Sequence, residues 1–254
     1  MSSPLFTNFT GDIVMPPSDP DPVFPVEIFQ QIIDHLASGR RRNYIPLLGT
    51  CSLVCKSFHS ICQPHLLREV EVGPCFPSSR EQLIGLLNRQ PYLRNHIKSL
   101  TYSLWHNRIV ENLQSIDGFC NNFLNLPNLK SLKIDSNKFK RLSFYSYNPD
   151  KFGFGRLVTY YTSTSLLSNL SLLNLWDVPI LTILASPHLL SLELIRCSIE
   201  PPEQTLQNTS FGLRKLKAVD VEDFSSAILA CCGALETVHS TGHVFSSKSS
   251  HLPI

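Results

Sequence analysis

Charged residues are scarce in this chain of 254 residues: they make up 17% of it, while hydrophobic residues make up 43%. So little charge beside so much apolar material excludes a chain that stays unfolded through self-repulsion. The 22 basic and 20 acidic side chains are scattered along the sequence, so no broad basic face is indicated. The composition predicts a folded protein that does not bind nucleic acid.

Long apolar runs are missing as well. Stretches such as Ile180 to Ala185 fall far short of the roughly 20 residues that a membrane helix needs. Residues 1–25 lack the basic start, apolar core and cleavage site of a secretory signal. The eight cysteines are therefore interpreted as reduced thiols in a core. We expect a cytoplasmic or nuclear protein without a membrane span, and residues 1–22 as a flexible, proline-rich leader.

Catalytic and metal-binding motifs are also lacking. There is no G-x-S-x-G turn for a nucleophile, and Val158 stands where a dinucleotide loop beginning at Gly153 needs its third glycine. Cysteines and histidines between residues 51 and 65 are spaced as on one face of a helix, and they lack the short spacing between ligand residues that is typical of a zinc site. We expect no catalytic residue, no cofactor and no metal, and an enzyme is the least favoured class.

A helical pattern begins near residue 25. Pro25 suits the start of a helix, and Ile28, Ile32 and Leu36 recur at four-residue spacing. Apolar positions between residues 47 and 62 predict two more short helices, after a solvated turn at Arg40–Asn43. Three helices in about forty residues cannot bury all of this apolar surface, so part of it is expected to face another domain or protein.

An L-x-x-L-x-L kernel recurs from Glu69 onward, and its last two positions alternate as in a strand that is buried on one face. The later starts, at residues 170, 189, 213 and 235, differ by 19, 24 and 22, close to the roughly 20 to 29 residues of leucine-rich repeats. The pattern predicts a mixed α/β fold in which strand-and-helix units stack into a curved solenoid. The kernels are Ile97, Leu100, Tyr102; Leu129, Leu132, Ile134; Leu170, Leu173, Leu175; Leu189, Leu192, Leu194; and two weaker copies, Leu213, Leu216, Ala218 and Leu235, Val238, Ser240.

Residues Phe24 to Val72 resemble the F-box, in the form common in fungal, basidiomycete-type F-box proteins with degenerate leucine-rich repeats. The resemblance is carried by the stretches 24–28, 32–36 and 51–58 and continues through 65–72. It implies a three-helix F-box motif at 23–68 and a repeat region at 69–254. That region looks shortened at its C-terminal end, because repeat arrays need polar terminal caps and this one ends soon after a weak copy.

The resemblance implies a substrate-recognition adaptor of an SCF-type cullin-RING ubiquitin ligase. The F-box docks on the Skp-family linker, the repeats bind an unknown target protein, and the chemistry takes place on another protein. Phe24 stands where leucine is usual, Phe58 stands where tryptophan is most common, and an insertion at Gly39–Asn43 carries three arginines. The implied linker-binding residues are Phe24, Pro25, Ile28, Ile32, Leu53, Val54, Cys55 and Phe58.

A second hypothesis is a non-enzymatic leucine-rich-repeat scaffold without a role in ubiquitin ligation. Linker binding, together with a target that accumulates when the chain is deleted, separates the two hypotheses. Both leave open which target is bound, whether that target must be modified, and which repeat residues contact it.

Overall fold

The structure is a computed structural model, and it describes residues 25–39, 41–72, 77–103, 121–136, 145–146, 154–164, 167–200, 211–224 and 226–241. The chain divides into two compact units, Met1–Cys62 and Gln63–Ile254. Described elements are helices in the first unit, and parallel strands with helices in the second. The predicted mixed α/β class is confirmed. The boundary between the two units follows Cys62 in the chain, whereas the sequence analysis places the domain boundary after residue 68.

The first unit contains α1 (Val26–Ala37), α2 (Arg41–Cys51) and the start of α3 (Lys56–Leu67). Pro25 precedes α1 with a φ of −52°, an angle that suits the proline ring. The predicted turn at Arg40–Asn43 is wrong, because α2 already begins at Arg41. The hydrophobic residues buried in this unit are Ile33, Ala37, Tyr44, Leu48, Ile61 and Cys62.

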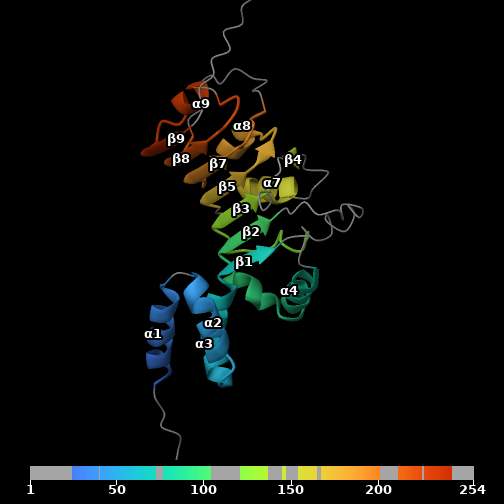
Figure 1. Cartoon of the computed structure of the whole chain (residues 1–254), viewed down its shortest axis with the longest axis vertical. Coiled ribbons are helices and arrows are strands. Elements are labelled where there is room, and N and C mark those ends of the chain that lie inside the picture. Colours follow the sequence, from blue (N-terminus) through green and yellow to red (C-terminus); the bar gives the residue numbers. More distant parts are fainter. Residues whose placement is uncertain are drawn as a thin grey trace, which may run out of the picture. The chain divides into compact units, whose positions relative to one another are not determined.

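Seven parallel strands of the second unit form one sheet in the order in which they occur in the chain (Figure 1). They are β1 (Glu69–Val72), β2 (Ser99–Ser103), β3 (Ser131–Asp135), β5 (Asn169–Leu173), β7 (Ser191–Ile195), β8 (Lys215–Val219) and β9 (Thr237–Thr241). A second small sheet pairs β4 (Tyr145–Ser146) with β6 (Leu175–Trp176). The segments between strands include α4 (Pro77–Arg89), the 3-10 helix η1 (Pro91–His96), α7 (Phe154–Thr164), α8 (Ile180–Leu184) and α9 (Ser226–Ala230).

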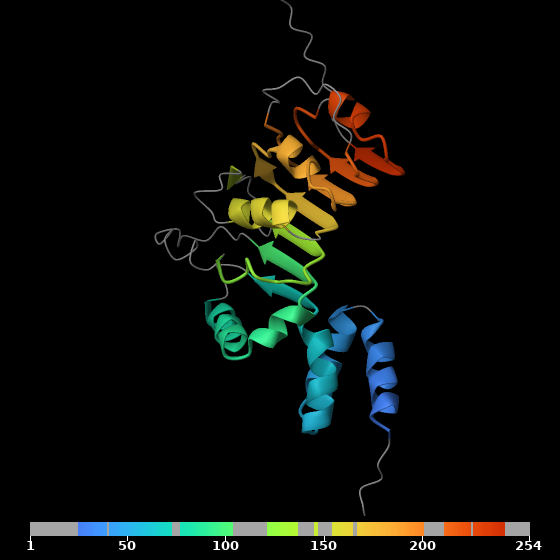
Figure 2. The ribbon, with the colours of Figure 1, turned by 180° about the vertical axis from the view of Figure 1, so that it is seen from behind.

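The strands of the large sheet keep one register. Leu100 pairs with Val70 on one side and Leu132 on the other, and this alignment continues to Val238 of β9. Alternate residues of a strand point to the same face, so aligned kernel residues share one face. Helices α7 and α8 lie against one side of the sheet, and their apolar residues belong to the same buried core as the kernel residues (Figure 2).

One predicted repeat is out of phase with the sheet. The sequence places the third kernel's start at Leu170, but Leu170 pairs with Leu132 and Leu192, which are second positions of their kernels. This kernel therefore starts three residues earlier, at Leu167, and Leu173 faces away from the core. The last three repeat intervals become 22, 24 and 22 residues.

The turns after three strands share one backbone conformation. Asn174, Arg196 and Asp220 directly follow β5, β7 and β8 with φ values of 58°, 52° and 52°. Each donates its backbone N–H to the last carbonyl of the next strand, at 2.8, 2.7 and 3.0 Å. Asparagine and aspartate tolerate this left-handed region better than most residues. The repeated turn keeps successive strands in the same register.

The predicted curved solenoid is not confirmed. The structure shows a parallel sheet with helices α7 and α8 on one face, which is not by itself a solenoid.

None of the helices among the described residues has the length and apolar character that crossing a bilayer demands.

Candidate functional site

Helix α1 carries two apolar stripes. Ile33 and Ala37 are buried in the core of the helical unit. Ile28 and Ile32 lie one turn apart on an adjoining side of the helix and are 43% and 50% exposed. Pro25, at the start of the helix, is exposed as well. One stripe therefore holds the unit together, and the other is left uncovered.

The turn between α2 and α3 presents the most exposed apolar side chains of the unit. Leu53 is 84% exposed and Val54 is 69% exposed, and Cys55 beside them is exposed as a free thiol. Tight backbone hydrogen bonds hold this turn: Leu53 N–H donates to the Thr50 carbonyl, and Val54 N–H donates to the Cys51 carbonyl, both at 3.1 Å. The bonds satisfy the backbone while both side chains point into solvent.

Phe58 connects α3 to α1. Its ring centroid lies 4.9 Å from that of Phe29, with the ring planes tilted by 57°, a favourable geometry for two aromatic rings. Phe58 is half-buried, so only part of its ring is open to a partner. Phe24, the remaining predicted linker-binding residue, lies outside the described residues.

Exposed apolar side chains are concentrated in the helical unit. Of the eleven large hydrophobic residues that are exposed within the described ranges, six lie between Val26 and Val54. Two of them, Val26 and Leu47, are absent from the predicted set. The sequence holds a partial signal for Leu47, because Leu47 and Leu48 are adjacent and neighbouring residues of a helix cannot both face a core on one side. The structure decides between them by burying Leu48 fully. We call the six residues the exposed apolar set: Val26, Ile28, Ile32, Leu47, Leu53 and Val54.

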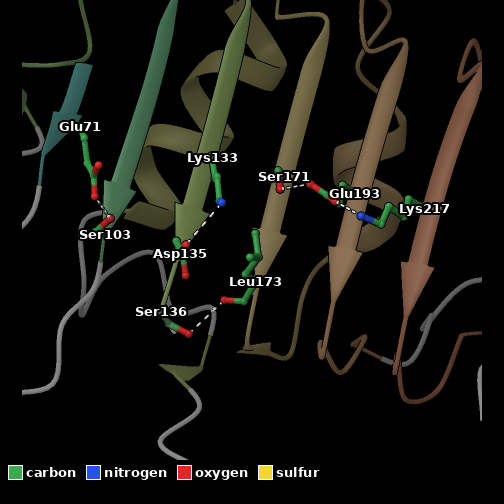
Figure 3. Close-up of polar contacts among 9 residues, drawn as sticks. All are labelled: Glu71, Ser103, Lys133, Asp135, Ser136, Ser171, Leu173, Glu193 and Lys217. Atoms are coloured by element: carbon green, nitrogen blue, oxygen red, sulfur yellow. Dashed lines mark hydrogen bonds and ion pairs between the residues drawn. The ribbon is translucent and has the colours of Figure 1, made fainter. Parts of the chain in front are cut away.

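The sheet offers a second candidate surface, which is the face opposite α7 and α8 and is called the open face here. Its strands carry polar side chains that contact one another (Figure 3). The Ser103 hydroxyl donates to the Glu71 carboxylate at 3.0 Å, and the Lys133 ammonium lies 3.4 Å from Asp135. These contacts link neighbouring side chains of the open face.

Glu193 is at the centre of a polar chain that crosses this face. It accepts hydrogen bonds from the Ser171 hydroxyl on β5 at 2.6 Å and from the Lys217 ammonium on β8 at 2.7 Å. Burial raises the pKa of Glu193, but the two hydrogen bonds and the charges of Lys217 and Lys133 outweigh burial and lower it. Glu193 is therefore ionised at neutral pH and joins three adjacent strands.

Thiol and metal chemistry have little support among the described residues. Burial raises the pKa of Cys197 to about 11, and it also raises the pKa of Cys62 and Cys232. Protonated, buried thiols are poor nucleophiles. Within the described ranges, no group of three or more histidine, cysteine, aspartate or glutamate residues is placed to hold a metal ion.

Comparisons of the chain with models of protein families, with curated proteins and with solved structures found no match. The two surfaces and the sequence motif at residues 24–72, rather than a match to a known protein, are the basis for a functional assignment.

Proposed function

We propose that this chain is a substrate-recognition adaptor of an SCF-type cullin-RING ubiquitin ligase, working in the cytoplasm or nucleus. Residues 23–68 are an F-box that docks on a Skp-family linker, and residues 69–254 bind the target protein. The observation that carries the proposal is the exposure of Ile28, Ile32, Leu53 and Val54, which belong to the F-box-like motif. Four such exposed apolar residues on one small helical unit indicate a protein-binding surface.

Energetic considerations support a docking role for these residues. Fully covering a valine, leucine or isoleucine side chain contributes roughly 1.5 to 3 kcal/mol. Among its described residues, the helical unit buries six hydrophobic side chains and leaves six large ones exposed, so much of this apolar surface is not used for folding. A few well-packed anchors of this kind dominate the affinity of a typical interface.

A leucine-rich-repeat assignment for residues 69–254 is part of the same proposal. Residues 189–199 read L-x-x-L-x-L-x-x-C-x-I, which matches the repeat pattern with cysteine at its asparagine-or-cysteine position. That cysteine, Cys197, is buried, and its thiol donates to the carbonyl of Leu172 in the preceding unit at 3.3 Å. The contact joins consecutive units, which fits a stacked repeat in which each unit packs on its neighbours.

An adaptor of this kind acts through proximity. The chain holds the target near the ubiquitin-charged conjugating enzyme and raises the effective concentration of target lysines there. Bond formation takes place on the conjugating enzyme, so the adaptor itself needs binding surfaces and no catalytic group.

The test is co-purification of the full chain with a fungal Skp-family linker. We expect the wild type to bind and the double variant Leu53→Asp, Val54→Asp to lose binding, because each aspartate places an unpaired charge in the interface. Both wild-type side chains are mostly exposed, so the variant keeps its fold, which its circular dichroism spectrum checks. Leu190→Asp is the matched control, since Leu190 is an exposed leucine of the sheet unit, 42% accessible, and lies outside the motif.

Alkylation of Cys55 reports on the same interface. The exposed thiol of Cys55 is expected to react with iodoacetamide in the free chain and to be protected in the linker complex, while buried Cys197 is protected in both states. Failure of the wild type to bind any such linker would contradict the proposal and favour a repeat scaffold without a ligase role.

A further inference from the structure

Three basic residues occupy the same position in three consecutive repeats. Arg68, Lys98 and Lys130 directly precede β1, β2 and β3. Their backbones are adjacent, because Lys98 N–H donates to the Arg68 carbonyl and Lys130 N–H donates to the Lys98 carbonyl, both at 2.9 Å. Neighbouring strands are about 4.8 Å apart. We call these three exposed residues the basic row.

The charges of the basic row lack the partners that several other cations of the sheet have. Lys133 lies beside Asp135, Lys217 beside Glu193, and Arg214 lies 3.6 Å from Glu236. Within the described part of the chain, no side chain of the basic row takes part in an ion pair or a hydrogen bond. Like charges at opposed positions of neighbouring strands repel one another. An anionic partner would relieve that repulsion.

Serines follow two of these cations in the sequence. Ser99 follows Lys98 and Ser131 follows Lys130, and the two serines are paired across β2 and β3. Both are half-buried. Their hydroxyls are neutral polar groups at the same ends of the strands as the basic row.

We propose that the basic row binds a stretch of acidic side chains on the target protein, which crosses the N-terminal ends of β1, β2 and β3. This inference rests on the proposed function of the sheet unit, Gln63–Ile254, as the part that holds the target. Arg68 belongs to that unit, although it is also the last residue of the F-box-like range 23–68. Alternate side chains of an extended peptide are about 6.6 Å apart, whereas neighbouring strands are about 4.8 Å apart. The long, flexible side chains of lysine and arginine can bridge this difference in spacing. Glu69 and Glu71 follow Arg68 on β1, so the positive potential is local and fits a short acidic segment better than a continuous polyphosphate.

Binding of labelled peptides to the full chain tests this inference. The probes are a short peptide of alternating glutamate and serine, a matched peptide with glutamine in place of glutamate, and an oligothymidylate. Fluorescence anisotropy is measured below about 0.1 M ionic strength, where the Debye length exceeds about 10 Å. The test variant is Lys98→Gln, Lys130→Gln. The matched control is Arg214→Gln, Lys215→Gln, which removes the same charge at two exposed positions, the residue before β8 and its first residue.

We expect the glutamate peptide to bind the wild type and the control equally, and to bind the test variant at least tenfold more weakly, a loss of about 1.4 kcal/mol. The glutamine peptide should not bind. Equal losses in both variants, no loss in the test variant, or tighter binding of the oligothymidylate would each overturn the inference. Linker co-purification on the same samples separates the two proposals. If the chain binds the linker but not the acidic peptide, the basic row is not a target site and the proposed adaptor function still stands.

Discussion

Glu193 shows how single residues on the open face depend on their neighbours in space. Its carboxylate lies between a hydroxyl on β5 and an ammonium on β8, so three strands contribute to one charged chain. These donors hold the pKa of Glu193 below its ordinary value in spite of partial burial. A group with a lowered folded-state pKa stabilises the fold above its unfolded-state pKa, and that contribution is lost as the pH falls through the folded value.

Replacing Glu193 by glutamine should therefore destabilise the sheet unit in a pH-dependent way. At pH 7 we expect a loss of about 0.5–1 kcal/mol, the range of a well-placed surface pair. The difference from the wild type should shrink as the pH falls below about 4.3, the ordinary glutamate pKa. Urea unfolding at several pH values measures it. Glu236→Gln, which removes a longer and more exposed bridge to Arg214, should cost less. A difference that stays constant with pH would contradict this account.

Helix α7 is attached to the chain before β3 by one buried side chain. The Tyr161 hydroxyl donates to the Phe123 carbonyl and accepts the Leu126 backbone N–H at 3.1 Å. Burial raises the pKa of Tyr161 well above its ordinary value, so the hydroxyl keeps the proton that it donates. The hydrogen bonds connect segments about 35 residues apart in sequence. They hold α7 against the segment that contains Phe123 and Leu126.

The variant Tyr161→Phe tests how much this attachment contributes. It removes both hydrogen bonds and leaves two buried backbone groups without their partner, which should cost about 1–3 kcal/mol in the free energy of unfolding. Tyr160→Phe is the matched control: Tyr160 is 39% exposed, so a change below about 0.5 kcal/mol is expected. Similar values for the two variants in denaturant titrations would show that the buried hydroxyl does not hold α7 in place.

The whole molecule consists of two units, each with a core of its own. Leu48 is fully buried among the helices of the first unit, and Leu132 is fully buried beneath the sheet of the second. Units with separate cores are expected to unfold as separate cooperative blocks rather than in one step. This division lies within six residues of the proposed boundary between linker docking and target binding, which follows residue 68.

Truncating one residue in each core tests the independence of the units. Leu48→Ala and Leu132→Ala should each cost roughly 2–5 kcal/mol. Hydrogen exchange followed by mass spectrometry should show faster exchange in residues 26–62 for the first variant and in residues 97–219 for the second. Faster exchange across both units in either variant would mean that the chain unfolds as one block.

Local patterns in the sequence predict much of the fold. Four-residue spacing after Pro25 predicts α1, and the kernels starting at residues 97, 129, 189, 213 and 235 predict strands in the phase that the sheet has. These predictions succeed because helical and strand periodicities are local properties of the chain. The kernel near Leu170 is placed wrongly, since leucines between residues 166 and 175 satisfy two phases and only pairing with β3 and β7 selects one.

The sequence by itself determined the element types, most of the strand phases and the motif from which linker-binding residues are proposed. Only the tertiary structure decided which apolar side chains remain uncovered, because Ile32 and Ile33 look alike in sequence and differ only in what packs against them. It also decided that Arg68, Lys98 and Lys130 form one row, and that Glu193 joins Ser171 to Lys217. These residues are 22 to 32 positions apart in the chain, and only the register of the parallel strands makes them neighbours.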